Sequence, residues 1–206
     1  MFDWTLFAVF LPTFFFVSIT PGMCMTLAMT LGMSVGVRRT LWMMLGELIG
    51  VATVAVASVV GVASFMFDHP QVFTAFKFVG GLYLAYLGTQ MWQAKGKMAL
   101  TNDNVTARIS NYELFSQGLI TAIANPKGWA FMVALLPPFI NPEKPFMVQL
   151  SALIGIIMFT EFSCLMLYAS TGKSIRLFMN QGNNLALLNR FSGGLMLLLG
   201  LWLILG

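Results

Sequence analysis

Three charged side chains stand out because each lies inside a long apolar stretch: Glu47, Lys127 and Glu161. A charge at the centre of a bilayer costs about 3 kcal/mol or more, so such a residue usually faces a cavity or a partner. A carboxylate there can bind an ammonium group or exchange a proton, because desolvation disfavours its charged form. Lys127 could bind a carboxylate, neutralise Glu161, or extend to the membrane interface. Glu47 could instead be an interfacial or capping carboxylate, and Glu161 could pair with Lys127 or with a hydroxyl.

Two short motifs predict breaks in apolar helices. Thr20-Pro21-Gly22 and Asn125-Pro126-Lys127 both lie within apolar runs, where proline removes a backbone donor. In lipid, the freed carbonyls must find partners or face a wet cavity. Thr and Asn are good N-cap residues, and the N-terminus of a half-helix suits a carboxylate. The alternative is a simple proline kink that serves packing.

The composition indicates that these residues lie in a membrane. Of the 206 residues, 58% are hydrophobic and 9% are charged, whereas an ordinary soluble domain is about 45–50% apolar and about 25% charged. A helix needs roughly 20 apolar residues to cross a bilayer. Six segments meet this requirement, at about 4–33, 41–67, 72–92, 115–140, 146–171 and 185–205, and the first and fourth contain the two proline motifs.

The two halves of the chain repeat each other. The stretch KFVGGL, Lys77–Leu82, is matched 113 residues later by RFSGGL, Arg190–Leu195. Glu47 and Glu161 are 114 residues apart, and the two motif prolines are 105 residues apart. Chance similarity between glycine- and leucine-rich helices is the alternative. Because each half has an odd number of spans, the second half must enter the membrane upside down, which is typical of secondary transporters.

The predicted fold is therefore an all-α integral membrane protein with six transmembrane helices. They form one transporter domain of two inverted three-helix repeats, with helices 1 and 4 broken. The repeats cover about residues 1–92 and 114–206, and a polar linker covers about 93–113.

Basic residues in the loops predict the orientation, because cytoplasmic loops carry an excess of Lys and Arg. Only Lys77 and Lys144 lie on one side. Eight lie in or beside the connections on the other side: Arg38, Arg39, Lys95, Lys97, Arg108, Lys173, Arg176 and Arg190. Both termini are thus expected to face outward.

Several classes of function are disfavoured. Sixteen methionines could suggest a soft-metal site, but methionine is also a flexible apolar filler, and the chain has one histidine and two cysteines. We see no nucleophile–base set, nucleotide loop or metal-ligand spacing. The sequence thus predicts no enzyme, no metal or cofactor and no nucleic-acid partner. Whether two copies associate is left open.

Three stretches, TPGMCMTLAMTLGMSVGVRRT, FKFVGGLYLAYLG and ANPKGWAFMVALLPPFI, resemble the LysE/RhtB family of bacterial amino-acid exporters. The resemblance covers nearly the whole chain. It implies export of amino acids across the inner membrane, driven by the proton gradient. Residues 20–22 and 125–127 match the two family motifs, and Glu47 falls where many relatives have an acid. Relatives usually read Thr-Pro-Gly-Pro, whereas Met23 stands here in place of the second proline.

We therefore expect a multi-pass exporter of small amino acids or close derivatives that works by alternating access with proton antiport. The transport site is expected to comprise Thr20, Pro21, Gly22, Glu47, Asn125, Pro126, Lys127 and Glu161. An exporter of another small solute or cation is one alternative, and a membrane scaffold that transports nothing is another.

Overall fold

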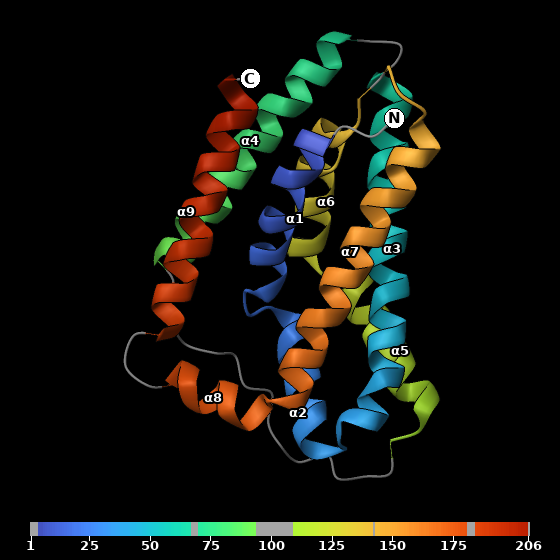
Figure 1. Ribbon diagram of the computed structural model, residues 1–206, viewed down its shortest axis with the longest axis vertical. Helices are drawn as coiled ribbons and strands as arrows, with labels where there is room; N and C mark the ends of the chain where they lie inside the picture. Colours follow the sequence, from blue (N-terminus) through green and yellow to red (C-terminus); the bar gives the residue numbers. More distant parts are fainter. Residues whose placement is uncertain (1–3, 67–69, 94–108, 142, 181–183, 206) are drawn as a thin grey trace.

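The computed structural model describes residues 4–66, 70–93, 109–141, 143–180 and 184–205, and most of these are helical (Figure 1). The helices run in the order α1 (Trp4–Ile19), α2 (Met23–Ser34), α3 (Val37–Met66), α4 (Pro70–Gln93), α5 (Asn111–Ile123), α6 (Pro126–Leu135), the 3-10 turn η1 (Pro137–Phe139), α7 (Phe146–Ser170), α8 (Gly172–Asn180) and α9 (Asn184–Leu205).

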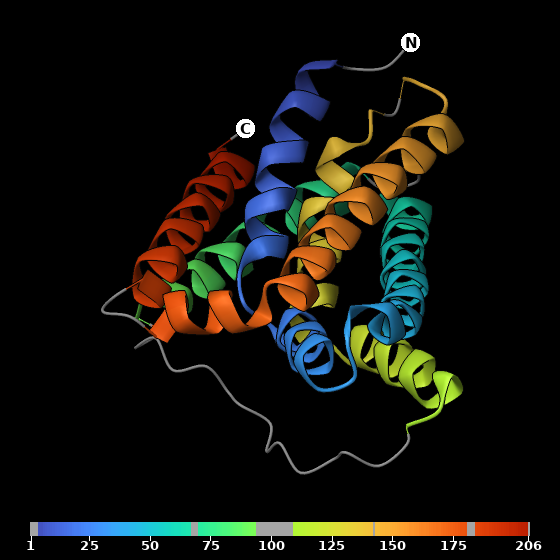
Figure 2. The same cartoon turned by 60° about the horizontal axis from the view of Figure 1, so that its bottom comes forward.

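Both predicted breaks are present. The chain bends by 57° between α1 and α2, and by 52° between α5 and the segment Pro126–Phe139. Each bend falls at a motif proline, because a proline has no N–H for the preceding turn and its ring excludes the carbonyl four residues back. The bend between α1 and α2 is visible in Figure 2.

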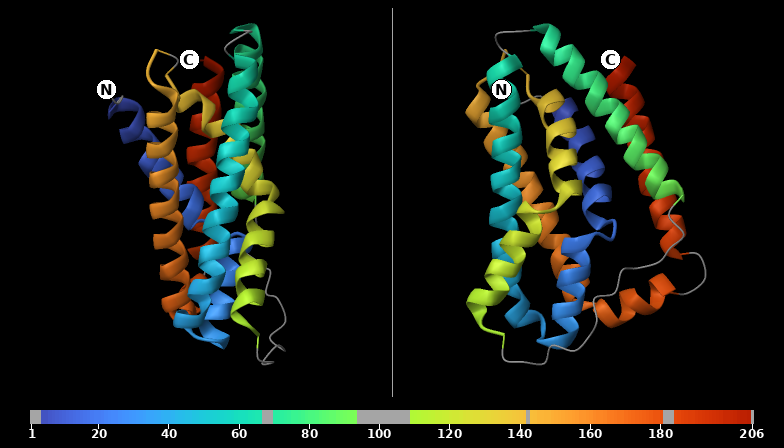
Figure 3. Two further views of the ribbon diagram at one scale, coloured as in Figure 1. Left: turned by 90° about the vertical axis from the view of Figure 1, so that its right-hand side faces the viewer. Right: turned by 180° about the vertical axis from the view of Figure 1, so that it is seen from behind.

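The fold is that of an all-helical membrane protein. Among the described residues, α3 (over Val37–Gly61) and α7 are each long and apolar enough to cross a bilayer, and each bent pair counts as one further span, which gives up to four. The long helices α4 and α9 pack along each other on one side of the molecule (Figure 3). Most of the expected linker lies outside the described residues.

One helix was not expected. The sequence indicated only a connection after residue 171, but residues Gly172–Asn180 form α8, which crosses the end of the bundle between α7 and α9 (Figure 1). Leu177 and Phe178 on this helix are exposed. Its nine residues are too few to span a bilayer, so the hydropathy pattern that revealed the other helices could not reveal it.

The breaks divide the interior into two apolar cores. One, the aromatic core, is built around Phe10, Phe14, Phe131 and Phe139, from α1, α6 and η1 together with parts of α3 and α7. The other, the methionine core, comprises buried side chains of α2, the first part of α3, α5 and the second half of α7: Cys24, Met25, Ala28, Met29, Leu31, Met43, Met44, Leu114, Cys164, Leu165, Tyr168 and Ala169.

Glycines allow two helix pairs to approach backbone to backbone. A Cβ added at Gly118 of α5 would lie 2.0 Å from the carbonyl oxygen of Met43, and one at Gly46 of α3 would lie 2.0 Å from that of Phe115. On the other side, a Cβ at Gly81 of α4 would meet the carbonyl oxygen of Gly200 in α9 at 2.7 Å. Small residues are the usual means of close packing between membrane helices.

This geometry predicts that Gly118→Ala lowers the thermal stability of the detergent-solubilised protein. Overpacking typically costs about 1–3 kcal/mol, which corresponds to a drop in Tm on the order of 2–10 °C. The matched control is Gly155→Ala in α7, where an added Cβ would meet no atom within 4 Å. That control should match or exceed the wild-type Tm, because alanine favours a helix over glycine. Equal Tm values for the two variants would contradict the close α3–α5 packing.

Candidate functional site

The site begins with a carbonyl group that Pro21 leaves without its helical donor. In a continuous helix, residue 21 would donate to the carbonyl of Val17, four residues back, but proline has no N–H. The Lys127 ammonium takes that place from the start of α6, with Nζ 3.3 Å from the Val17 oxygen and 3.5 Å from that of Thr20. Lys127 also lies 5.9 Å from the centre of the Phe131 ring. One broken helix thus completes the hydrogen bonding of the other.

Two more side chains satisfy the end of α1. The hydroxyl of Tyr168 donates to the Ile19 carbonyl at 2.8 Å. The Thr20 hydroxyl lies 2.7 Å from the Phe16 carbonyl oxygen and 2.7 Å from the buried hydroxyl of Ser192 in α9. The expectation that Thr20 caps the following half-helix was wrong. With Pro21-Gly22 after it, Thr20 belongs to the end of α1, and Gly22 is the N-cap of α2.

The second break is satisfied locally. Asn125 is the N-cap of α6, as predicted, and its Oδ1 accepts from the Lys127 backbone N–H at 3.1 Å. The carbonyl of Ala122, which Pro126 leaves free, accepts from the Asn125 N–H at 3.3 Å. The Asn125 amide also donates to the Cys24 sulfur at 3.6 Å. The N-terminus of α6 therefore has a cap of its own.

The N-terminus of α2 differs. Its N-cap, Gly22, has extended backbone and carries no side chain that could accept a hydrogen bond. The first hydrogen bond back to the cap comes from Thr26 N to Gly22 O, at 2.9 Å. The N–H groups of Met23, Cys24 and Met25 precede that bond, and no described side chain caps them.

Both intramembrane acids face this region, in different settings. Glu161 Oε1 accepts from the Ser18 hydroxyl at 3.0 Å, so Glu161 meets a hydroxyl, one of the partners expected for it. Glu47 is only 1% exposed. Glu47 and Cys24 both line the cavity described below. Two buried polar atoms among the described residues have no partner, Glu47 Oε2 and Ser58 Oγ.

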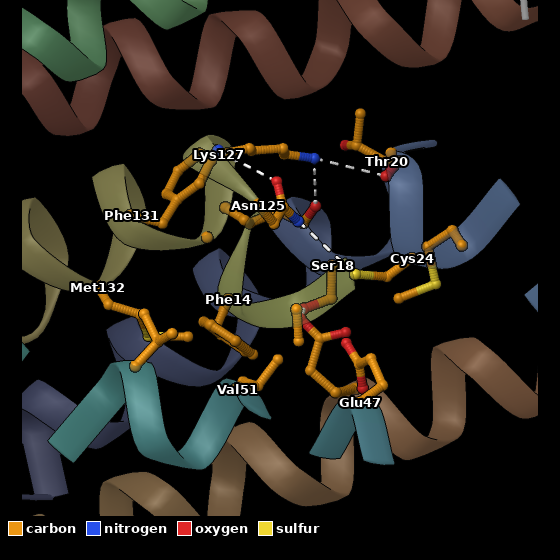
Figure 4. A pocket seen from close by; sticks show the side chains of 17 residues that line it. Phe14, Ser18, Thr20, Cys24, Glu47, Val51, Asn125, Lys127, Phe131 and Met132 are labelled. Carbon is orange, nitrogen blue, oxygen red and sulfur yellow. Dashed lines mark hydrogen bonds between the residues drawn. The ribbon is translucent and has the colours of Figure 1, made fainter. Parts of the chain in front are cut away.

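These groups surround one cavity of about 50 Å³ between the two cores (Figure 4). That volume holds about four water molecules. Six of the eight predicted site residues line it, namely Thr20, Gly22, Glu47, Asn125, Lys127 and Glu161. The two motif prolines make the breaks but do not line the cavity.

The lining residues that were not predicted are Phe14, Val17, Ser18, Cys24, Met25, Val51, Val54, Ala122, Gly128, Phe131 and Met132. Ser18 and Cys24 flank the first motif, so their proximity to it was the available signal. The apolar members carry no chemical mark that distinguishes them from ordinary core residues. Figure 4 shows Phe14, Val51, Phe131 and Met132 on one side of the cavity and Cys24, Thr20 and Glu47 on the other.

A helical membrane protein with a cavity that contains charged side chains at two helix breaks has the features of a small-molecule transporter. The chain belongs to the LysE type translocator family, which it matches over residues 15–206. This family consists of transporters and not of enzymes, in agreement with the sequence.

Two relatives show the extent of the similarity. A homoserine/homoserine lactone efflux protein of Salmonella typhimurium is 27% identical over 199 residues, which cover 97% of this chain and 95% of the relative. An uncharacterized membrane protein of Vibrio cholerae is 27% identical over 187 residues, which cover 90% of each chain. No solved structure matches the chain.

The contacts at the end of α1 predict that Tyr168→Phe destabilises the protein. The substitution leaves the Ile19 carbonyl without its 2.8 Å donor, and one buried unsatisfied group costs about 1–3 kcal/mol. Thermal unfolding in detergent measures the loss. Tyr112→Phe, at a tyrosine that is 78% exposed, serves as the control and should retain the wild-type Tm. A Tyr168→Phe variant as stable as this control would show that the Ile19 carbonyl does not need the hydroxyl.

Proposed function

We propose that this protein exports small amino acids or close derivatives from the cytoplasm in exchange for protons. The observation that carries the proposal is the meeting of Glu47, Glu161 and Lys127 in one cavity between two broken helices. Intramembrane ionisable groups of this kind mark substrate pathways and proton relays. The efflux of homoserine named for the Salmonella relative supports a cargo of amino-acid size.

The proposed architecture has six spans in two inverted repeats, with α4 and α9 as the third span of each half. Both termini face outward, and the basic loops lie in the cytoplasm. The two bends, 57° and 52°, and the cavity between them support this plan, because broken helices of inverted repeats meet near the midplane. Alternating access then exposes the cavity to each side in turn.

In this proposal, the broken helix ends hold the carboxylate of the cargo. Glu47 and Glu161 hold its ammonium group and the coupling proton. A carboxyl in a closed cavity can release its proton when a cationic group arrives, because an opposite charge favours the ionised form. Export of cargo and import of a proton are coupled if cargo binding at this pair of acids favours release of the proton from it.

The test is export from proteoliposomes that contain the purified protein under an imposed pH gradient. The vesicles are loaded with homoserine, threonine, leucine and lysine. Selective loss of one or more amino acids that depends on the gradient supports the proposal. No loss from vesicles that contain folded, inserted protein contradicts it and directs the search to other solutes, and then to a scaffold.

Glu161→Gln should abolish export driven by the pH gradient, with a loss of about tenfold or more, because an amide cannot carry the coupling proton. The protein should remain folded, since glutamine keeps the shape and can still accept from Ser18. The control is Glu143→Gln at an exposed glutamate outside the helices, which should export at the wild-type rate. Normal export by the Glu161→Gln variant would remove Glu161 from the mechanism.

A further inference from the structure

The cavity has two kinds of unused hydrogen-bonding capacity, and they are complementary. The acceptor is Glu47 Oε2, which has no partner although Glu47 is only 1% exposed. The donors are the N–H groups at the start of α2, which no described side chain caps. Glu47 lines the same cavity as Gly22, Cys24 and Met25 at the start of α2.

The other polar groups of the cavity differ because each has at least one partner within the protein. The Lys127 ammonium donates to the carbonyls of Val17 and Thr20. The N-terminus of α6 is capped by Asn125, and Glu161 accepts from Ser18. Each of these groups therefore already has a partner within the protein, through one Glu161 oxygen and two of the three Lys127 N–H donors. A ligand that used Glu47 and the start of α2 would supply missing partners instead.

We infer that this cavity recognises the zwitterionic head of a neutral α-amino acid, with the carboxylate at the N-terminus of α2 and the ammonium group at Glu47. The inference rests on the proposed function and assigns each charged group of the cargo to a group of the protein. A helix N-terminus offers N–H groups and a partial positive charge to an anion. An α-amino acid carries its ammonium group next to its carboxylate, as the neighbouring positions of Cys24 and Glu47 require.

The rest of the cavity determines which side chain is accepted. Phe14, Val51, Phe131 and Met132 form the side that faces away from Cys24 and Glu47 (Figure 4). A charged side chain directed at this apolar side would be buried without a partner, which is strongly unfavourable. A neutral side chain avoids that cost. Glu161 then remains available for the coupling proton and makes no direct contact with the cargo.

The head-group assignment is tested at Gly22 with a substitution that should stabilise α2 and weaken binding of the cargo. Asparagine is among the best N-cap residues, so Gly22→Asn places an amide oxygen on the N–H groups that the carboxylate would use. Gly22→Ala adds only a methyl group, whose nearest neighbours are Lys127 atoms at 3.7 and 3.9 Å and the Thr20 oxygen at 3.9 Å. The half-saturating concentration should be at least about fivefold higher for Gly22→Asn than for Gly22→Ala, while its Tm is equal or higher. Equal half-saturating concentrations would overturn the assignment.

The roles of the two acids separate in a counterflow assay, in which labelled and unlabelled amino acid exchange without a pH gradient. Glu47→Gln should weaken binding about tenfold or more, because the ammonium group loses a charged partner, and counterflow should fall with it. Glu161→Gln should retain counterflow and lose only export driven by the gradient. Loss of counterflow in Glu161→Gln together with its retention in Glu47→Gln would reverse the two roles and overturn the inference.

Cargo analogues test the chemical class. The comparison uses whichever of homoserine, threonine and leucine is exported. The amide of that amino acid lacks the carboxylate and should compete for export at least about tenfold more weakly than the amino acid itself. Lysine should compete no better than the amide. Competition by the amide or by lysine equal to that of the neutral amino acid would overturn the inference and leave amino-acid export intact. If no amino acid in the panel is exported, the proposed function itself is contradicted.

Discussion

The interior of this protein is organised around the carbonyl of Val17. In water a carbonyl freed by a proline is hydrated, but in a bilayer it must be bonded within the protein. Here its partner is Lys127, which reaches from the other broken helix. Because of this requirement, the two breaks lie next to each other in the structure. Tyr168 donates to the neighbouring carbonyl of Ile19, and Ser192 hydrogen-bonds with the Thr20 hydroxyl.

The two breaks have similar sequences and different consequences. Asn125 satisfies the start of α6 from within its own motif, and Lys127 is then free to serve α1. Gly22 offers α2 no such cap. The site therefore has one occupied and one unoccupied helix N-terminus, together with one paired and one unpaired acid. Two breaks with similar motifs thereby give the cavity two different ends, which suits the proposed zwitterionic cargo.

The sequence predicted the parts of the molecule that local chemistry controls. Pro21 and Pro126 located both bends, and the apolar runs located the long helices to within a few residues. The rest depended on contacts between distant segments. Thr20 was expected to cap α2, but its hydroxyl faces back to Phe16 and across to Ser192. Tyr168 carried no signal in the sequence, because only folding brings it to the end of α1.

The two cores on either side of the cavity differ in stiffness. The aromatic core contains stacked and edge-on rings, such as Phe10 against Phe14 and Phe139, whose geometry admits few arrangements. The methionine core contains Met25, Met29, Met43 and Met44, and unbranched thioethers can adapt to many shapes at little cost. The cavity therefore has one rigid wall and one plastic wall, which suits the alternating access proposed for this protein. The plastic wall lies toward Arg38 and Arg39, where the proposed orientation admits the cargo.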